Sequence, residues 1–130
     1  MTKEQQMVLE FQQTFKQVWE DKPTIPDIHT QELRDRLFVE ELNELRTAFA
    51  ENNLIEIADG LGDLLYILLG TANACGIDLE PVFQEIHRSN MTKIGGTVNE
   101  YGKLIKPPTY SKPDLEPILQ KQIESRWGLL

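Results

Sequence analysis

The sequence predicts an all-α protein: an antiparallel bundle of four main helices with a short C-terminal helix, assembled as an oligomer. Apolar residues recur at three- and four-residue steps in four segments before residue 90, which is the spacing of one helix face. A very short connection joins the second and third segments, which makes them antiparallel neighbours. The third segment is apolar around most of its circumference, which indicates burial from several sides and therefore by a second subunit.

The totals limit the chain to one domain and to a narrow range of partners. With 130 residues, 40% of them hydrophobic, it suits a single globular domain over 1–130. The formal net charge of −8 argues against a nucleic-acid backbone or an anionic membrane as the main partner. The single cysteine, Cys75, excludes an internal disulfide and lies on an apolar face, as a small core residue does. The first 20 residues lack a signal-peptide pattern and no apolar run can cross a bilayer, so we expect a cytoplasmic protein.

The first predicted helix runs from Thr2 to Glu20. Its aromatic and apolar stripe is the ordinary sign of a core-facing side. Phe15 or Trp19 can instead offer a flat ring on which a nucleobase stacks, and the sequence leaves both interpretations open. A loop with two prolines follows over 21–30.

The second and third predicted helices form a hairpin. The second begins at Gln31, with Thr30 as its N-cap, and ends near residues 51–53. The third continues to about Cys75, and Gly76 is placed to end it. Three glycines inside this helix are each unfavourable there, so we expect another backbone or a ligand to come close to them. They are Gly60, Gly62 and Gly70.

The rest of the chain predicts two shorter helices separated by a basic loop. Asp78 or its neighbour caps a fourth helix, and a fifth, capped near Asp114, covers 113–126. Between them, the Gly-rich segment from Ile94 to Tyr110 is too long and too basic for a simple turn. A basic loop beside an acidic site suits a phosphate-bearing ligand, and the alternative is a solvated loop. The lysines of this part are Lys93, Lys103 and Lys106.

Carboxylates gather on one side of each of the two long helices. At 100° per residue, each of two trios falls within an arc of roughly 60–100° of its helix. No lysine or arginine lies between residues 52 and 74. The alternative to a binding site is a pair of solvated acidic faces. The trios are Glu40, Glu41 and Glu44, and Glu56, Asp59 and Asp63.

Two acidic trios that face each other need a counter-charge. An unpaired buried charge is costly, or its pKa shifts until the group is neutral, and the trios would also repel each other. A divalent cation resolves both problems, because carboxylate oxygens are the ligands that Mg²⁺ and Mn²⁺ prefer. The sequence therefore predicts a Mg²⁺ site between two facing helices, at which Mn²⁺ can substitute.

These residues resemble a known superfamily. A Glu-Glu-x-x-Glu pattern on one helix and Glu-x-x-Asp on the next is similar to the signature of the all-α nucleoside triphosphate pyrophosphohydrolases. That group includes MazG-like enzymes, dimeric dUTPases and phosphoribosyl-ATP pyrophosphohydrolases. Here the two halves stand at 40–44 and 56–59, and Asp63 follows one turn later.

A later stretch strengthens the resemblance. Residues 89–93, followed by 102–110, look like the phosphate-side segment of the MazG-like, phosphoribosyl-ATP-pyrophosphohydrolase-like branch. The resemblance covers most of the chain, from Val8 to about Asp114.

The resemblance implies a Mg²⁺-dependent enzyme that hydrolyses a nucleoside triphosphate between the α- and β-phosphates, giving a monophosphate and pyrophosphate. It makes Glu40 and Glu41 the catalytic residues, with Glu40 a further ligand or the base that orients the attacking water. It implies metal ligands on both helices: Glu41, Glu44, Glu56 and Asp59, with Asp63 as a ligand or just behind them. It implies phosphate or sugar contacts from Asn90, Lys93 and Lys103, over which Tyr110 closes. A homodimer or a homotetramer is implied as well.

Two other functions stay open. A non-catalytic helical oligomer that binds a nucleotide or a partner protein predicts the same helices without metal-dependent turnover. A regulatory metal-binding bundle would bind Mn²⁺ or Fe²⁺ with no nucleotide preference. The lysine-bearing Gly-rich segment favours the enzyme, with removal of aberrant nucleotides as one role. The preferred base and sugar and the number of subunits do not follow from the sequence.

Overall fold

Five α-helices and one small β-hairpin build the structure, a computed structural model that describes residues 1–125. In chain order the helices are α1 (Lys3–Thr14), α2 (Ile28–Ala50), α3 (Leu54–Ala74), α4 (Leu79–Met91) and α5 (Glu116–Ser125), with strands β1 (Thr97–Val98) and β2 (Leu104–Ile105) between α4 and α5. The predicted all-α class is confirmed, because the two strands are only two residues long.

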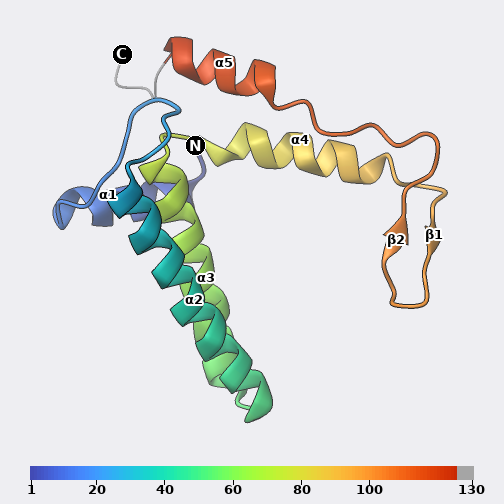
Figure 1. Ribbon diagram of the computed structural model, residues 1–130, viewed down its shortest axis with the longest axis horizontal. Coiled ribbons are helices and arrows are strands. Elements are labelled where there is room, and N and C mark those ends of the chain that lie inside the picture. The colour runs from blue at the N-terminus through green and yellow to red at the C-terminus, as the bar shows by residue number, and fades with distance from the viewer. Residues whose placement is uncertain (126–130) are drawn as a thin grey trace.

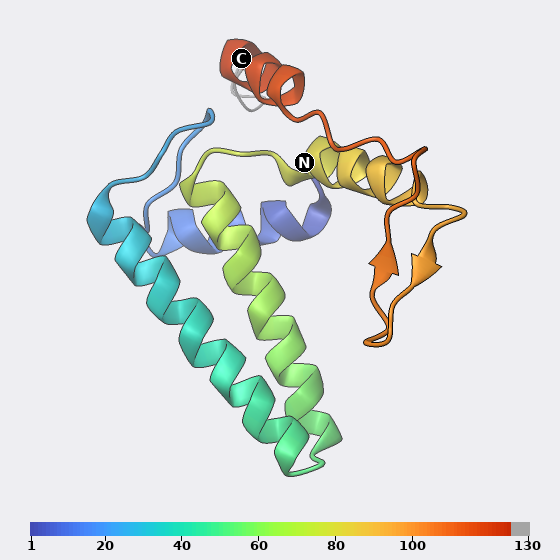
Figure 2. The same ribbon diagram turned by 45° about the vertical axis from the view of Figure 1, so that its right-hand side comes forward.

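Helices α2 and α3 form the long antiparallel hairpin around which the chain is arranged (Figure 2). The turn is tight because Asn52 adopts a left-handed conformation with φ 52° and Asn53 caps α3 by accepting a hydrogen bond from Glu56 N. Gly60 sets the distance between the two helices, since a Cβ there would lie 3.2 Å from Leu45 Cδ1 and 3.3 Å from Leu45 Cα. The predicted close approach therefore occurs at Gly60.

Helix α1 packs across α3 through a buried polar cluster (Figures 1 and 2). Gln5, Gln12 and Asn73 are each at most 1% exposed. Asn73 Nδ2 donates to Gln12 Oε1 at 2.8 Å, and Gln5 Nε2 donates to Asn73 Oδ1 at 3.0 Å. Buried amides are tolerated when they satisfy one another in this way, so the cluster fixes how α1 lies on α3.

Two helix starts or ends differ from the prediction. Helix α1 stops at Thr14 and does not continue to Glu20, because Lys16 turns left-handed at φ 55° and Glu20 N donates to Asn73 O at the end of α3. Helix α2 begins at Ile28, since the carboxylate of Asp27, and not Thr30, accepts the capping hydrogen bond. Both differences come from side-chain and tertiary hydrogen bonds that hydrophobic periodicity does not report.

Helix α4 leads away from the α2–α3 hairpin to the β-hairpin, and the chain then returns so that α5 lies near the start of α4 (Figures 1 and 2). Asp78 caps α4 as predicted. The prediction of a loop over 94–110 is wrong in part, because β1 and β2 pair there with Val98 opposite Leu104. Helix α5 starts at Glu116, later than predicted, and residue 126 of the predicted span lies outside the described residues. Gln122 holds α5 to the start of α4 through both its Oε1 and its Nε2 and the backbone of Asp78.

Apolar side chains of α3 remain uncovered by this chain. Five of them are between 47% and 79% exposed: Leu54, Ile55, Leu61, Leu65 and Leu68. Such a face normally marks an interface. The oligomer stays a prediction, and these residues are the surface through which we expect it to form. No helix within 1–125 combines the length and the apolar character that a membrane span requires.

Candidate active site

Three carboxylates from α2 and α3 converge at the middle of the hairpin. Glu41 and Glu44 lie one turn apart on α2, and Asp63 faces them from α3. One carboxylate oxygen from each of these residues lies within 4.8 Å of the other two. The arrangement arises because a three-residue step keeps both glutamates on one helix face and because Gly60 lets α3 come close. We call these three residues the acidic cluster.

Glu41 has the least favourable surroundings of the three residues in the acidic cluster. Its Oε2 atom is buried and makes no hydrogen bond to any of residues 1–125. Burial, followed by the nearby charges of Asp63 and Glu44, raises the pKa of Glu41 from its ordinary 4.5 to about 6. A buried acceptor without a donor is unfavourable, and like charges make it more so. The donor set is all oxygen, which fits a hard divalent cation such as Mg²⁺ or Mn²⁺.

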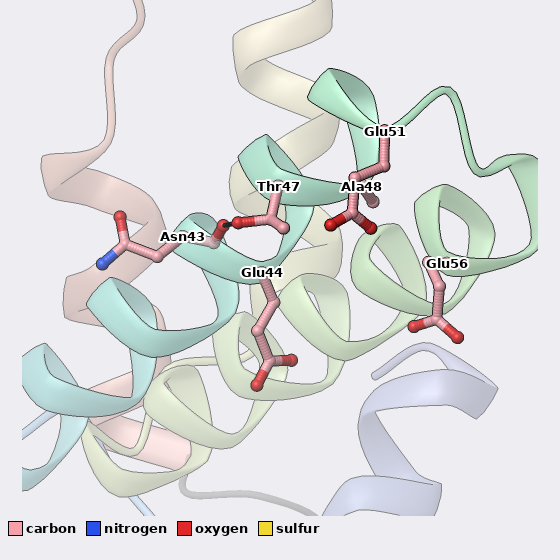
Figure 3. A pocket seen from close by; sticks show the side chains of 6 residues that line it. All are labelled: Asn43, Glu44, Thr47, Ala48, Glu51 and Glu56. Atoms are coloured by element: carbon pink, nitrogen blue, oxygen red, sulfur yellow. Dashed lines mark hydrogen bonds between the residues drawn. The ribbon is translucent and has the colours of Figure 1, made fainter.

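A cavity of about 500 Å³ lies near the α2–α3 turn (Figure 3). It extends from Glu44 toward that turn. Glu44 and Glu51 reach it from α2, and Glu56 reaches it from α3. Thr47 is turned toward its own helix, where its hydroxyl donates to Asn43 O at 3.0 Å. Glu44 thus connects the acidic cluster to a second group of carboxylates. The sequence analysis missed Glu51, although its position seven residues after Glu44 places it on the same face of α2.

The other two predicted acids stand apart from these groups. Glu40 on α2 and Asp59 on α3 are exposed, and neither belongs to the three-carboxylate cluster or to the lining of the cavity. Glu40 immediately precedes Glu41, and Asp59 lies one turn from Asp63, so both remain within a short distance along their helices. Their predicted roles stay predictions.

The predicted phosphate-side residues lie on the C-terminal part. Tyr110 is their centre: the Nζ atom of Lys106 lies 4.6 Å and that of Lys93 5.8 Å from the centre of its ring. Asn90 and Lys103 are exposed, the latter beside the turn of the hairpin. Strands β1 and β2 follow the end of α4 and lie on the side of the molecule away from α2 (Figures 1 and 2). A single chain therefore does not bring these residues onto its own acidic cluster.

The two predicted stacking residues have different surroundings. Phe15 is 63% exposed, and its ring centre lies 4.6 Å from that of Phe11. Phe11 in turn packs edge-on against Tyr66 of α3, with ring centres 5.6 Å apart. Trp19 is half-buried in the segment after α1. Phe11 and Tyr66 thus form the aromatic contact between α1 and α3, which the sequence analysis did not single out.

The facing helices of this all-α chain gather two glutamates and an aspartate at one centre, which defines the class of protein as a helical bundle with an acidic site. Comparison with known families specifies which one. Residues 8–90 match the phosphoribosyl-ATP pyrophosphohydrolase family, and the chain belongs to this family. The match confirms the predicted superfamily and runs from α1 almost to the end of α4. The family takes its name from pyrophosphohydrolases that act on phosphoribosyl-ATP, which is a nucleotide.

A viral relative shares much of this region. An uncharacterized protein of Acanthamoeba polyphaga mimivirus is 40% identical over 79 residues, which are 58% of this chain and 32% of that protein. The chain therefore spans about a third of the length of this relative.

Proposed function

We propose that the protein hydrolyses a nucleoside triphosphate between its α- and β-phosphates, releasing a nucleoside monophosphate and pyrophosphate. The observation that carries the proposal is the acidic cluster with the unsatisfied Oε2 of Glu41. Glu41, Glu44 and Asp63 would hold Mg²⁺ or Mn²⁺, with Glu56 and Asp59 as further ligands along α3. A cation held there would supply charge neutralisation for the phosphates and for the leaving pyrophosphate.

The chain's own residues supply the remaining steps. Glu40, exposed beside Glu41, would accept a proton from the attacking water, whose oxygen bonds to the α-phosphorus as the bond to the bridging oxygen breaks. Lys93, Lys103, Asn90 and Tyr110 would contact the phosphates or the sugar. Lysine side chains suit this task because they offer point charges to phosphate oxygens.

A homodimer or homotetramer is part of the proposal. The exposed leucines of α3 need cover, and a second copy offers it with the same apolar surface. The β-hairpin lies away from α2 and α3 of its own chain (Figure 1), so an assembly would also let one copy's lysines approach another copy's carboxylates. Removal of aberrant nucleotides in the cytoplasm is the role we propose.

The test is a product analysis. The protein is incubated with a panel of ribo- and deoxynucleoside triphosphates, with Mg²⁺ or with EDTA, and the products are separated by chromatography. We expect monophosphate and pyrophosphate only with metal, abolished turnover in Asp63→Asn, and normal turnover in Glu32→Gln, an exposed acid of α2. Diphosphate with phosphate would refute the bond assignment. No turnover of any nucleotide would favour the non-catalytic binding function.

A further inference from the structure

A second cavity lies along the same groove, between α1, α2 and α3. It has a volume of about 220 Å³ and a mostly apolar wall, to which Phe11, Leu37 and Tyr66 contribute. Arg34 also lines it, together with Gln17 and the backbone at Gly70. The volume is below that of a typical pocket for a whole small-molecule ligand, so it suits one planar ring system. We call it the Arg34 cavity.

Arg34 is buried without a carboxylate. Its side chain is 8% exposed, and burial lowers the pKa of the guanidinium. Nε donates to Thr71 Oγ1 and Nη2 to Ile67 O, both at 2.9 Å. No acidic side chain within 1–125 forms an ion pair with it. Because a guanidinium has five N–H donors and two of them are used here, three remain for an acceptor in the cavity.

The fold makes room for this guanidinium. A Cβ on residue 70 would collide with Nη2 of Arg34, so glycine at that position lets the guanidinium lie against α3, whereas a larger residue would require the arginine side chain to shift. This accounts for one of the helix-interior glycines that the sequence singled out. Gly70 O in turn accepts a hydrogen bond from Gln12 Nε2 at 2.9 Å, which keeps the backbone beside Arg34 in place.

The distance between the Arg34 cavity and the acidic cluster matches the distance between the base and the phosphates of a nucleotide. Leu37 and Arg34 precede Glu41 by four and seven residues, so they lie on the same face of α2, about 6 and 10 Å along the axis. Tyr66 and Gly70 follow Asp63 by three and seven residues on α3, with the same relation. A base in the cavity would therefore leave its phosphates at the acids.

We infer that the Arg34 cavity binds the nucleobase and selects bases that present a carbonyl oxygen where cytosine and adenine carry an exocyclic amino group, which are uracil, thymine and guanine. An arginine only donates hydrogen bonds, so it favours a carbonyl oxygen and opposes an exocyclic amino group. The ring would lie against Phe11 and Tyr66, and the exposed amide of Gln17 would meet another edge. This inference rests on the proposed function, because it names the substrate of the same site.

The first test compares bases of equal size. We expect kcat/KM for dUTP to exceed that for dCTP by about 10- to 100-fold, and GTP to exceed ATP in the same sense, because one lost charged hydrogen bond has that effect. In Arg34→Gln the dUTP/dCTP ratio should fall toward one, since glutamine both donates and accepts. Arg36→Gln, an exposed arginine of the same helix, should keep the wild-type ratio. A wild-type preference for dCTP or ATP would overturn the inference, and so would an unchanged ratio in folded Arg34→Gln.

A binding measurement separates the inference from the proposed function. Wild-type protein is titrated with uridine and cytidine monophosphates in EDTA by calorimetry, where no turnover occurs, and Phe11→Leu is titrated alongside. We expect tighter binding of the uridine nucleotide and weaker binding of both nucleotides by Phe11→Leu. If no triphosphate is hydrolysed but this preference holds, the proposed function fails and the base site stands. The base site fails if hydrolysis occurs but neither base is preferred and inorganic phosphate displaces both nucleotides. The titration of Phe11→Leu tests the base site even if Arg34→Gln does not fold.

Discussion

The substitution Glu41→Gln should make the metal-free protein more stable while it abolishes turnover. Glutamine keeps the size of the side chain and removes its charge. At neutral pH the wild-type carboxylate is ionised, is half-buried and faces Glu44 and Asp63 across less than 4.8 Å. Its Oε2 has no donor within the described chain, whereas the amide of glutamine can donate a hydrogen bond to either neighbouring carboxylate.

The magnitude follows from the raised pKa of Glu41. A rise from 4.5 to about 6 penalises the ionised form in the folded state by about 2 kcal/mol at full effect. Because the side chain keeps partial contact with water, we expect the gain in the free energy of unfolding to be about 1 kcal/mol. The folded state binds this proton more tightly, so the penalty is present above pH 6 and disappears as the pH falls through 6 toward 4.5.

The assay is urea unfolding of both proteins in EDTA at pH 8 and at pH 4.5, with Glu32→Gln as the matched control. Glu41→Gln should be the more stable protein at pH 8 and equal to wild type at pH 4.5. Mg²⁺ should stabilise wild type and the control, because a ligand that binds only the folded state raises the free energy of unfolding. It should not stabilise Glu41→Gln. A variant that is less stable than wild type at pH 8, or one that Mg²⁺ stabilises equally, would refute the reasoning.

Three further predictions concern the fold. Gly60→Ala should lower the free energy of unfolding by about 1–2 kcal/mol, because its Cβ would press on Leu45, whereas Gly62→Ala has nothing within 4 Å to meet; equal urea midpoints would argue against the close helix approach. Asn73→Ala should cost about 2–3 kcal/mol in the same assay, since it leaves the buried amides of α1 unsatisfied, and a neutral result would contradict that cluster. Hydrogen bonds from Arg88, then from Asp114 N, lower the pKa of Glu85 to about 2, so their contribution to stability is present above pH 4.5 and is lost as the pH falls toward 2; NMR titration of Glu85 near pH 4.5 would contradict this.

Much of the helical framework could be predicted because its signals are local. The periodicity of apolar residues predicted α2, α3 and α4, and Asp78 and Gly76 marked the start of α4 and the end of α3. These features depend on contacts within a few residues, so they can be read without knowing the rest of the fold. The early end of α1 could not be predicted, because it depends on the hydrogen bond from Glu20 N to Asn73 O of α3, 53 residues away.

Buried polar groups were the main omission. Gln5, Gln12 and Asn73 lie in the core, and Arg34 lines a cavity. An argument from hydrophobic periodicity assigns all of these polar residues to the surface. Their burial depends on partners from other helices, which satisfy their hydrogen bonds. The β-hairpin was missed for a related reason, since two-residue strands leave almost no alternating pattern.

By itself, the sequence determined the helices, the two acidic faces and the family, because helical periodicity and the order of acids along a helix are local properties. Only the tertiary structure decided which acids meet. Glu41, Glu44 and Asp63 converge, whereas Glu40 and Asp59 stay exposed, and that outcome depends on the rotation and offset of α3 against α2. The contact of Gly60 with Leu45 and the position of Arg34 against Gly70 set both, and such contacts between distant residues exist only once the chain has folded.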